Sequence, residues 1–410
     1  MRNLLIIIII LATAVGPTRA DDHLLWRLGA EAAMGGVPRT NGFLRGDNPL
    51  STPIGSTGAL ALRADFAFSP ASRLGRLYPG LRQGIGLELR TFNCHDILGR
   101  PASLYIYQGA PFARLADDLT LGYEWQFGAA FGWHRSNLTH YLPPVSTRLT
   151  AHMALALKFT YRLSPALDLI IGPTVSHYSN GNTAYPNGGV NTVGLAMGIA
   201  WHLPASRRAS AESTLGAHVG VRNAVVEEAY NKAPGQTVEN KKEGQKIERR
   251  LWATEIIAYG AWRKRPISID DEAQMIPGHF GVAGLQVAEI RQLGRWFGAG
   301  AALTAQYDES SGLGRHWVEG TVGDNIKFTR PPVREQLSLG LSLHGELTAA
   351  IFTVSAGLGV DLIRPRAANR FFQSLALKTF LTPRLFLHTG YRIGDFRNPQ
   401  NLMLGLGVRL

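Results

Sequence analysis

The feature that most constrains this chain is an alternation with period two between large apolar side chains and small or polar ones. Successive side chains of a β-strand point to opposite faces, so such a segment gives a strand with two chemically different faces. A membrane barrel needs strands of this kind, because its outer face contacts lipid and its lumen is polar. The clearest apolar register is Leu119, Leu121, Tyr123, Trp125, Phe127, Ala129, Phe131 and Trp133.

The alternation recurs along the chain. Residues 153–162 repeat it, with Lys158 and Arg162 on the face of small side chains. The runs are about 9–13 residues long, which suits a tilted transmembrane strand, whereas a soluble sandwich has shorter strands around an apolar core. The candidate strands are 24–34, 58–69, 84–92, 102–112, 119–133, 153–162, 166–179, 190–203, 213–223, 250–263, 279–289, 295–306, 336–346, 349–361, 369–380, 384–394 and 401–410.

These segments predict an all-β fold, a transmembrane antiparallel outer-membrane β-barrel of roughly 14–16 strands. Bacterial barrels usually have an even number of strands, so at least one candidate is expected to be a loop or plug segment, and the doubtful ones lie between 213 and 306. We expect a single barrel domain over residues 21–410. The composition is too apolar for a disordered chain and too rich in Gly for a helical bundle, since 45% of the residues are hydrophobic, 18% are charged and 46 are Gly.

The first twenty residues indicate a cleaved signal peptide. Arg2 is followed by an apolar run over residues 4–14, and Thr18 and Ala20 stand at the expected cleavage positions. The run is too short for a membrane anchor. We therefore expect the mature chain to start at Asp21 and to be exported to the outer membrane of a Gram-negative cell.

The expected partners follow from charge and from the C-terminal strand. The formal net charge is +12, but export argues against nucleic acid and favours anionic outer-membrane lipids. Loop 224–249 is rich in Lys and Arg and is either simply solvated or in contact with lipid phosphates. The alternating residues 402–410 resemble the strand that the barrel assembly machinery recognises, with Leu410 in place of the usual terminal aromatic residue.

One segment carries candidate chemistry. His177 and Ser179 are two residues apart at the end of an apolar stripe, where polar side chains are costly unless they have a use. A serine nucleophile needs a base, and Asn191 on the outer register of the next strand could orient the imidazole. Asn180 and Gly181 could supply donors to an oxyanion. The same residues could also form only a polar hairpin, because Asn-Gly pairs favour turns.

Residues 78–205 resemble the lipid A 3-O-deacylase (PagL) family, also described as acyloxyacyl-hydrolase-like. The resemblance covers roughly a third of the chain and includes the whole candidate site. The matching pieces are YPG followed by GIGLEL, then LGRPASLYIYQ, GAAFGWH, HYSNG and PNGGVN.

The resemblance implies an outer-membrane barrel that hydrolyses an acyl ester of lipid A, part of lipopolysaccharide, on its lipid-facing wall. It gives His177 the role of base, Ser179 that of nucleophile and Asn180 a place in the oxyanion hole, and no cofactor is required. The family's acid aligns with Asn191, so either the amide orients His177 alone, another carboxylate reaches in, or activity is reduced or lost. Strands continue beyond the family's usual end, so we expect a barrel larger than its typical eight strands.

Two other functions stay open. A porin-like or structural barrel without catalysis would be consistent with Asn191 and the long second half, and a phospholipase could use the same serine and histidine. His134, His140 and His152 do not have a spacing typical of a metal site, and no metal is expected.

Overall fold

The computed structural model describes residues 24–134, 141–203, 252–264, 266–269, 272–276, 278–294, 296–321, 326–364, 370–396 and 398–410. These residues form two closed antiparallel β-barrels of eight strands each, which are separate compact units of the chain. The signal peptide and the candidate strand 213–223 lie outside the described residues.

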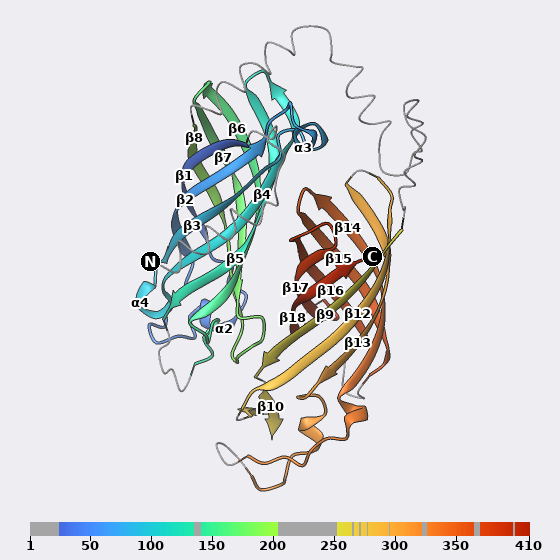
Figure 1. Ribbon diagram of the computed structural model, residues 1–410. Helices are drawn as coiled ribbons and strands as arrows, with labels where there is room; N and C mark the ends of the chain where they lie inside the picture. The colour runs from blue at the N-terminus through green and yellow to red at the C-terminus, as the bar shows by residue number, and fades with distance from the viewer. Residues whose placement is uncertain are drawn as a thin grey trace, which may run out of the picture. The chain divides into compact units, whose positions relative to one another are not determined.

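The first barrel runs through eight consecutive strands (Figure 1). Every neighbouring pair is antiparallel, and β1 pairs with both β2 and β8, which closes the sheet. The strands are β1 (Leu24–Gly36), β2 (Ser56–Phe68), β3 (Arg82–Phe92), β4 (Gly99–Ala116), β5 (Leu119–Trp133), β6 (Leu149–Ser164), β7 (Leu167–Ser179) and β8 (Val190–His202).

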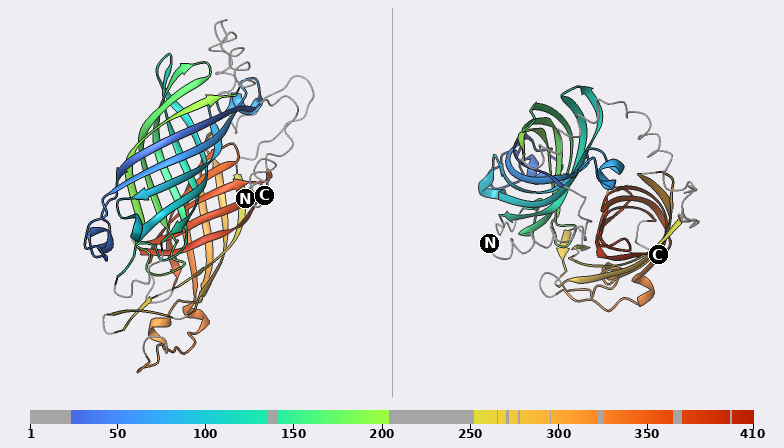
Figure 2. Two further views of the ribbon diagram at one scale, coloured as in Figure 1. Left: turned by 90° about the vertical axis from the view of Figure 1, so that its left-hand side faces the viewer. Right: turned by 45° about the horizontal axis from the view of Figure 1, so that its top comes forward.

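The second barrel closes in the same way, by the pairing of its first strand, β9, with its last, β18 (Figure 2). The strands β10 (Pro266–Ile269) and β11 (Glu272–Met275) pair only with each other. The barrel strands are β9 (Trp252–Arg263), β12 (Phe280–Gln292), β13 (Phe297–Asp308), β14 (Leu337–Ala349), β15 (Phe352–Ile363), β16 (Phe371–Phe380), β17 (Leu385–Gly394) and β18 (Asn398–Arg409).

The all-β fold is confirmed, and the sixteen barrel strands of the described chain agree with the expected 14–16. The expectation of one barrel larger than eight strands is wrong, because the strands close as two barrels. Alternation assigns each strand two faces, but it does not encode which distant strand a barrel's first strand pairs with. The alternation therefore could not predict that β1 pairs with β8 and β9 with β18.

The predicted registers hold along most strands. On β7 the odd-numbered residues face outward, with Ile171 and Val175 exposed, whereas Asp168 and Ser176 on the other register are buried. Lys158 likewise lies inside the first barrel, as its register predicted. On β18, Leu404, Leu406 and Val408 are exposed in the same alternating manner. An apolar outer belt over a polar lumen is the arrangement of a membrane barrel.

Trp133 is an exception to its predicted outward register. Its side chain is buried, and its indole Nε1 donates to Thr150 Oγ1 at 2.9 Å. Gly132, the residue before it, has φ +93, a conformation outside the extended strand that breaks the alternation there. Trp133 therefore joins the buried residues at the end of the barrel rather than the lipid-facing wall.

Ion pairs fill both lumens. In the first barrel Arg63 binds Glu124 and also binds Glu31 at 2.8 Å. In the second barrel Lys378 lies between Glu255 and Glu346 and binds both carboxylates. Buried charges are tolerated when they are paired, so the inward-facing residues of each barrel form connected polar networks.

The connections of the first barrel differ between its two ends. At one end, residues 117–118 and 165–166 are tight turns and the connection 69–81 carries the short helix α3 (Arg73–Leu77). At the other end the connections are 37–55, 93–98, 134–148 and 180–189. At this second end the short helix α2 (Gly42–Arg45) lies in the connection 37–55, and α4 (His95–Leu98) lies in the connection 93–98. In outer-membrane barrels the long loops lie on the extracellular side. Among the described residues, none of the helices has the length and apolarity to cross a bilayer.

Because each barrel satisfies its own backbone hydrogen bonds and leaves no open sheet edge, we expect residues 21–203 and residues 252–410 to fold separately. Each part, refolded in detergent, should give the circular dichroism of a β-protein and a gel mobility that changes on boiling. The full chain under the same conditions is the control. A half that stays unfolded while the full chain folds would contradict this independence.

Candidate active site on the first barrel

The structure brings His177 and Asn191 together on the outer wall of the first barrel. They face each other across the β7–β8 pair, and His177 Nδ1 lies 2.7 Å from Asn191 Oδ1. Both belong to the outward registers, beside Val175 and Val193, which are 46% and 50% exposed. The pairing follows from register alone, since residues directly opposite on antiparallel strands have adjacent side chains.

The hydrogen bond selects one form of the imidazole. An amide oxygen only accepts, so the bond with Asn191 Oδ1 requires a proton on His177 Nδ1. In the neutral ring, Nε2 then carries the lone pair. That is the tautomer that a general base needs when it takes a proton from a hydroxyl group.

Ser179 shares the outward register of His177 and ends β7. The residue as a whole is buried, 8% exposed, and it pairs with Ala151 of β6. Among the described residues, its hydroxyl and the imidazole of His177 form no hydrogen bond. Same-face residues of a strand are about 6.6–6.8 Å apart, and catalytic contacts often shorten only when substrate binds.

Tyr178, between these two residues, points in the opposite direction and is fully buried. Its hydroxyl donates to Glu88 Oε1 at 2.9 Å and accepts from Arg90 Nε at 2.8 Å. Because neighbouring side chains of a strand lie on opposite faces, this inward anchor helps to keep His177 and Ser179 on the outer wall.

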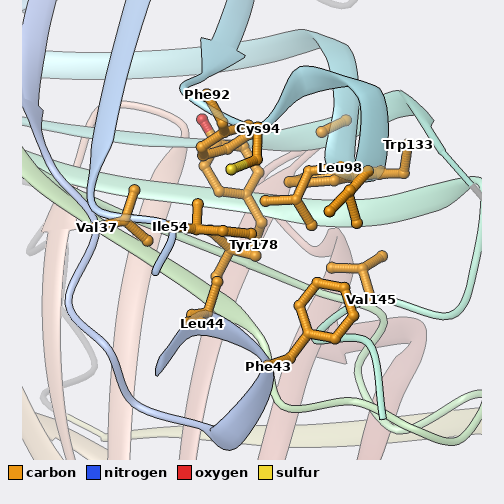
Figure 3. Packing of buried hydrophobic residues seen from close by; sticks show 13 residues of the cluster. Val37, Phe43, Leu44, Ile54, Phe92, Cys94, Leu98, Trp133, Val145 and Tyr178 are labelled. Atoms are coloured by element: carbon orange, nitrogen blue, oxygen red, sulfur yellow. The ribbon is translucent and has the colours of Figure 1, made fainter. Parts of the chain in front are cut away.

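Tyr178 also belongs to an apolar cluster, which we call the plug (Figure 3). Its ring meets that of Trp133 edge-on, with the centroids 5.4 Å apart. The helices α2 and α4 supply part of the plug from the connections 37–55 and 93–98. Its buried members are Val37, Phe43, Leu44, Ile54, Phe92, Cys94, Ile97, Leu98, Ala130, Trp133, Val145, Tyr178 and Val190.

The candidate oxyanion donors lie directly after Ser179. The Asn180 backbone N–H donates to Asn187 Oδ1 at 3.1 Å, and its side-chain Nδ2 donates to Ser146 Oγ at 3.1 Å. Gly181 follows with φ +62, in the left-handed region that favours glycine.

The described residues offer His177 no carboxylate in place of Asn191. Glu88, close to this end of β7, binds Tyr178 and Arg90 on the lumen side. Of the two open explanations that keep a working site, the geometry supports orientation by the amide alone over a second acid. Three residues near the site carried no signal in the sequence, because their contacts join distant loops. Asn41 donates to the Gly189 carbonyl, the Pro144 carbonyl accepts from the Gly189 N–H, and Ser146 accepts from Asn180.

The described strands of the second barrel lack a comparable pair on their outer face. Their histidines are His344 and His388, and both are buried. His344 Nε2 lies 2.9 Å from Ser342 Oγ, but both side chains are in the lumen. Among the described side chains, no group of three His, Cys, Asp or Glu could hold a metal ion. The candidate site therefore belongs to the first barrel.

Residues 121–200, which contain the candidate site, match the model of the lipid A 3-O-deacylase (PagL) family. Residues 252–410 match the C-terminal domain of acyloxyacyl hydrolase. The family resemblance is confirmed. The PagL match covers most of β5–β8, and the second match covers the second barrel from β9 to its end.

Solved structures of outer-membrane proteins are also similar. The outer-membrane enzyme PagL is 18% identical, and the match covers 42% of this chain and 97% of PagL, with a TM-score of 0.30. Neisserial surface protein A is 10% identical over 43% of this chain and 97% of its own, also with a TM-score of 0.30. No curated protein sequence matches the chain.

The Tyr178 anchor can be tested by removing its hydroxyl. Tyr178→Phe leaves Glu88 and Arg90 one partner short in a buried place, which costs about 1–3 kcal/mol. We expect a lower denaturant midpoint for the first barrel, measured on residues 21–203 or, if the halves do not fold alone, on the full chain. Tyr161→Phe is the matched control, because Tyr161 is exposed on the outer wall. Equal midpoints for the two variants would contradict an anchoring role.

Proposed function

We propose that this protein is an outer-membrane lipid A deacylase that hydrolyses an acyl ester with Ser179 as nucleophile and His177 as base. The observation that carries the proposal is the His177–Asn191 hydrogen bond on the apolar outer wall, at the end with the long loops. It lies within the part of the chain that matches the lipid A 3-O-deacylase family. A substrate in the outer leaflet would meet the site without entering the lumen.

The apolar residues around the site suit acyl chains. Leu155 of β6, Val175 of β7 and Val193 of β8 are all exposed on the outer face. Leu155 and Val193 both pair with Val175, so the three side chains form one continuous row below His177. Fatty acyl chains lying along this row would bring their ester carbonyl to the level of Ser179.

The reaction then follows the logic of a serine hydrolase. His177 Nε2 takes the proton from Ser179 Oγ, which attacks the ester carbonyl. Asn180 Nδ2 and the Gly181 N–H donate to the oxyanion, and the imidazolium returns its proton to the leaving sugar oxygen. Water, activated by the same imidazole, attacks the acyl-serine and releases the fatty acid. No cofactor takes part in these steps.

The proposed function also includes a location in the outer membrane. We propose export by the signal peptide at residues 1–20 and insertion into a Gram-negative outer membrane by the barrel assembly machinery. Two apolar outer walls with polar lumens support a membrane location for both barrels.

The enzyme is tested by comparing lipid A from Gram-negative cells that express the wild type, Ser179→Ala, His177→Ala and Ser176→Ala. Mass spectrometry should show loss of one acyl chain with the wild type. The first two variants should be at least about 1,000-fold slower, because removal of a nucleophile or base leaves only residual catalysis. Ser176 is the matched control, since it lies on the same strand but faces the lumen.

Unchanged lipid A in the wild-type cells would overturn the deacylase, as would full activity of Ser179→Ala. If the purified protein releases fatty acid from phosphatidylethanolamine vesicles but leaves lipid A intact, the enzyme is a phospholipase. If it acts on neither lipid, the barrel is not catalytic.

Asn191→Asp tests whether the missing acid limits the rate. Aspartate is nearly isosteric with asparagine, so it can keep the 2.7 Å contact with His177 Nδ1 while adding a charge that stabilises imidazolium. We expect kcat to rise about tenfold, whereas Asn191→Leu should lower it. Initial rates on purified lipid A in detergent check both variants. A fall in kcat with Asp would show that the amide is required as such.

A further inference from the structure

We propose that Gly189 and Asn41 are positioning residues that hold the imidazole of His177 in place from the loop side. The inference rests on the proposed function of His177 as the base. Neither residue takes part in the chemistry. They act because Gly189 lies against the ring and Asn41 fixes Gly189.

The edge of the His177 imidazole between its two nitrogens lies where a side chain at position 189 would be. A Cβ atom at this position would lie 2.9 Å from His177 Cε1 and 3.3 Å from the Tyr178 carbonyl oxygen. Its φ of +68 is also in the left-handed region. A side chain here would have to displace the ring, so the bare backbone of Gly189 sets how far the imidazole can swing toward the loop.

The backbone of Gly189 is held on both sides. Its N–H donates to the Pro144 carbonyl at 2.8 Å, and its carbonyl accepts from Asn41 Nδ2 at 3.3 Å. The side chain of Asn41 also lies against Gly188, where a Cβ atom would come within 2.8 Å of Nδ2. Two loops, 37–55 and 134–148, therefore converge on the peptide that contacts His177.

Asn41 is in turn fixed by the plug. Its Oδ1 caps α2 by accepting from the Leu44 N–H at 3.0 Å. Phe43 and Leu44 of that helix are buried members of the plug (Figure 3). A continuous set of contacts thus leads from the plug through Asn41 and Gly189 to the imidazole.

This support matters because the ring has a weak orienting partner. The hydrogen bond to Asn191 is between neutral groups and is weaker than one to a carboxylate. It holds Nδ1, but on its own it restrains the ring poorly. Contact with Gly189 on the Cε1 edge limits the remaining motion, and small displacements of a catalytic group can cost about 100-fold in rate.

Two variants separate positioning from folding. Gly189→Ala places a methyl group against the ring, whereas Asn41→Asp keeps the acceptor for Leu44 N–H and removes the donor to Gly189. We expect kcat to fall about 100-fold and about tenfold respectively, with KM within about twofold of the wild type. Gly320→Ala is the matched control for backbone strain, because Gly320 has φ +79 with open space around it, and it should keep full activity.

The ring itself gives a second readout that does not depend on lipid substrate. In protein labelled with ¹⁵N-histidine, the His177 signals, assigned by their loss in His177→Gln, should indicate the Nδ1–H tautomer. Both variants should shift these signals or mix the tautomers, while the gel mobility on boiling remains that of a folded barrel. Unchanged signals and unchanged kcat in Gly189→Ala and Asn41→Asp would overturn the positioning role.

Labelling of Ser179 by a fluorophosphonate distinguishes this inference from the proposed function. A wild type that is labelled but leaves lipid A intact has an activated serine and a different substrate. In that case slower labelling of the two variants would still support positioning, and equal labelling would refute it. If the wild type is not labelled at all, the nuclear magnetic resonance comparison alone decides whether Gly189 and Asn41 fix the ring.

Discussion

The buried hydroxyl of Tyr178, held between Glu88 and Arg90, is the interaction on which the candidate site depends. The lumen of the first barrel supplies the charges, the plug supplies the apolar surroundings, and Tyr178 belongs to both. Because this side chain must point inward, the residues before and after it point outward. The position of a serine and a histidine on a lipid-facing wall thus follows from a polar contact on the opposite side of the strand.

The same division of faces explains why two barrels of such different sequence share one architecture. Each turns an apolar wall outward and balances its inward charges locally, as Arg63 does with Glu31 and Glu124, and Lys378 with Glu255 and Glu346. A buried charge without its partner is costly, so these networks favour a particular register for the strands that carry them. The outward His177 and Ser179 are exceptional because their polarity is not used in such a network.

The features that could be predicted from the sequence are those that depend on residues close together in the chain. Strand positions, their two faces, and the places of His177 and Asn191 on the outward registers follow from period two, and the structure agrees. Ser179 shares the register of His177, but it is buried at the end of β7. Closure into two barrels depends on pairing between strands far apart, which alternation does not specify. Trp133 turned inward because the φ of Gly132 breaks the period locally. The Asn41–Gly189 contact joins residues 148 positions apart and left no local signal.

Asn191 changes what the rest of the site must provide. A carboxylate both orients the imidazole and stabilises its positive charge, whereas an amide oxygen selects the Nδ1–H tautomer and adds little charge stabilisation. The tautomer is thus secured by Asn191, and the ring's position depends more on steric contact, which Gly189 provides from a backbone held by Pro144 and Asn41. Contact can replace the orienting effect of the acid but not its charge. We therefore expect a deacylase with Asn191 to place its base correctly but to be slower than one with a carboxylate.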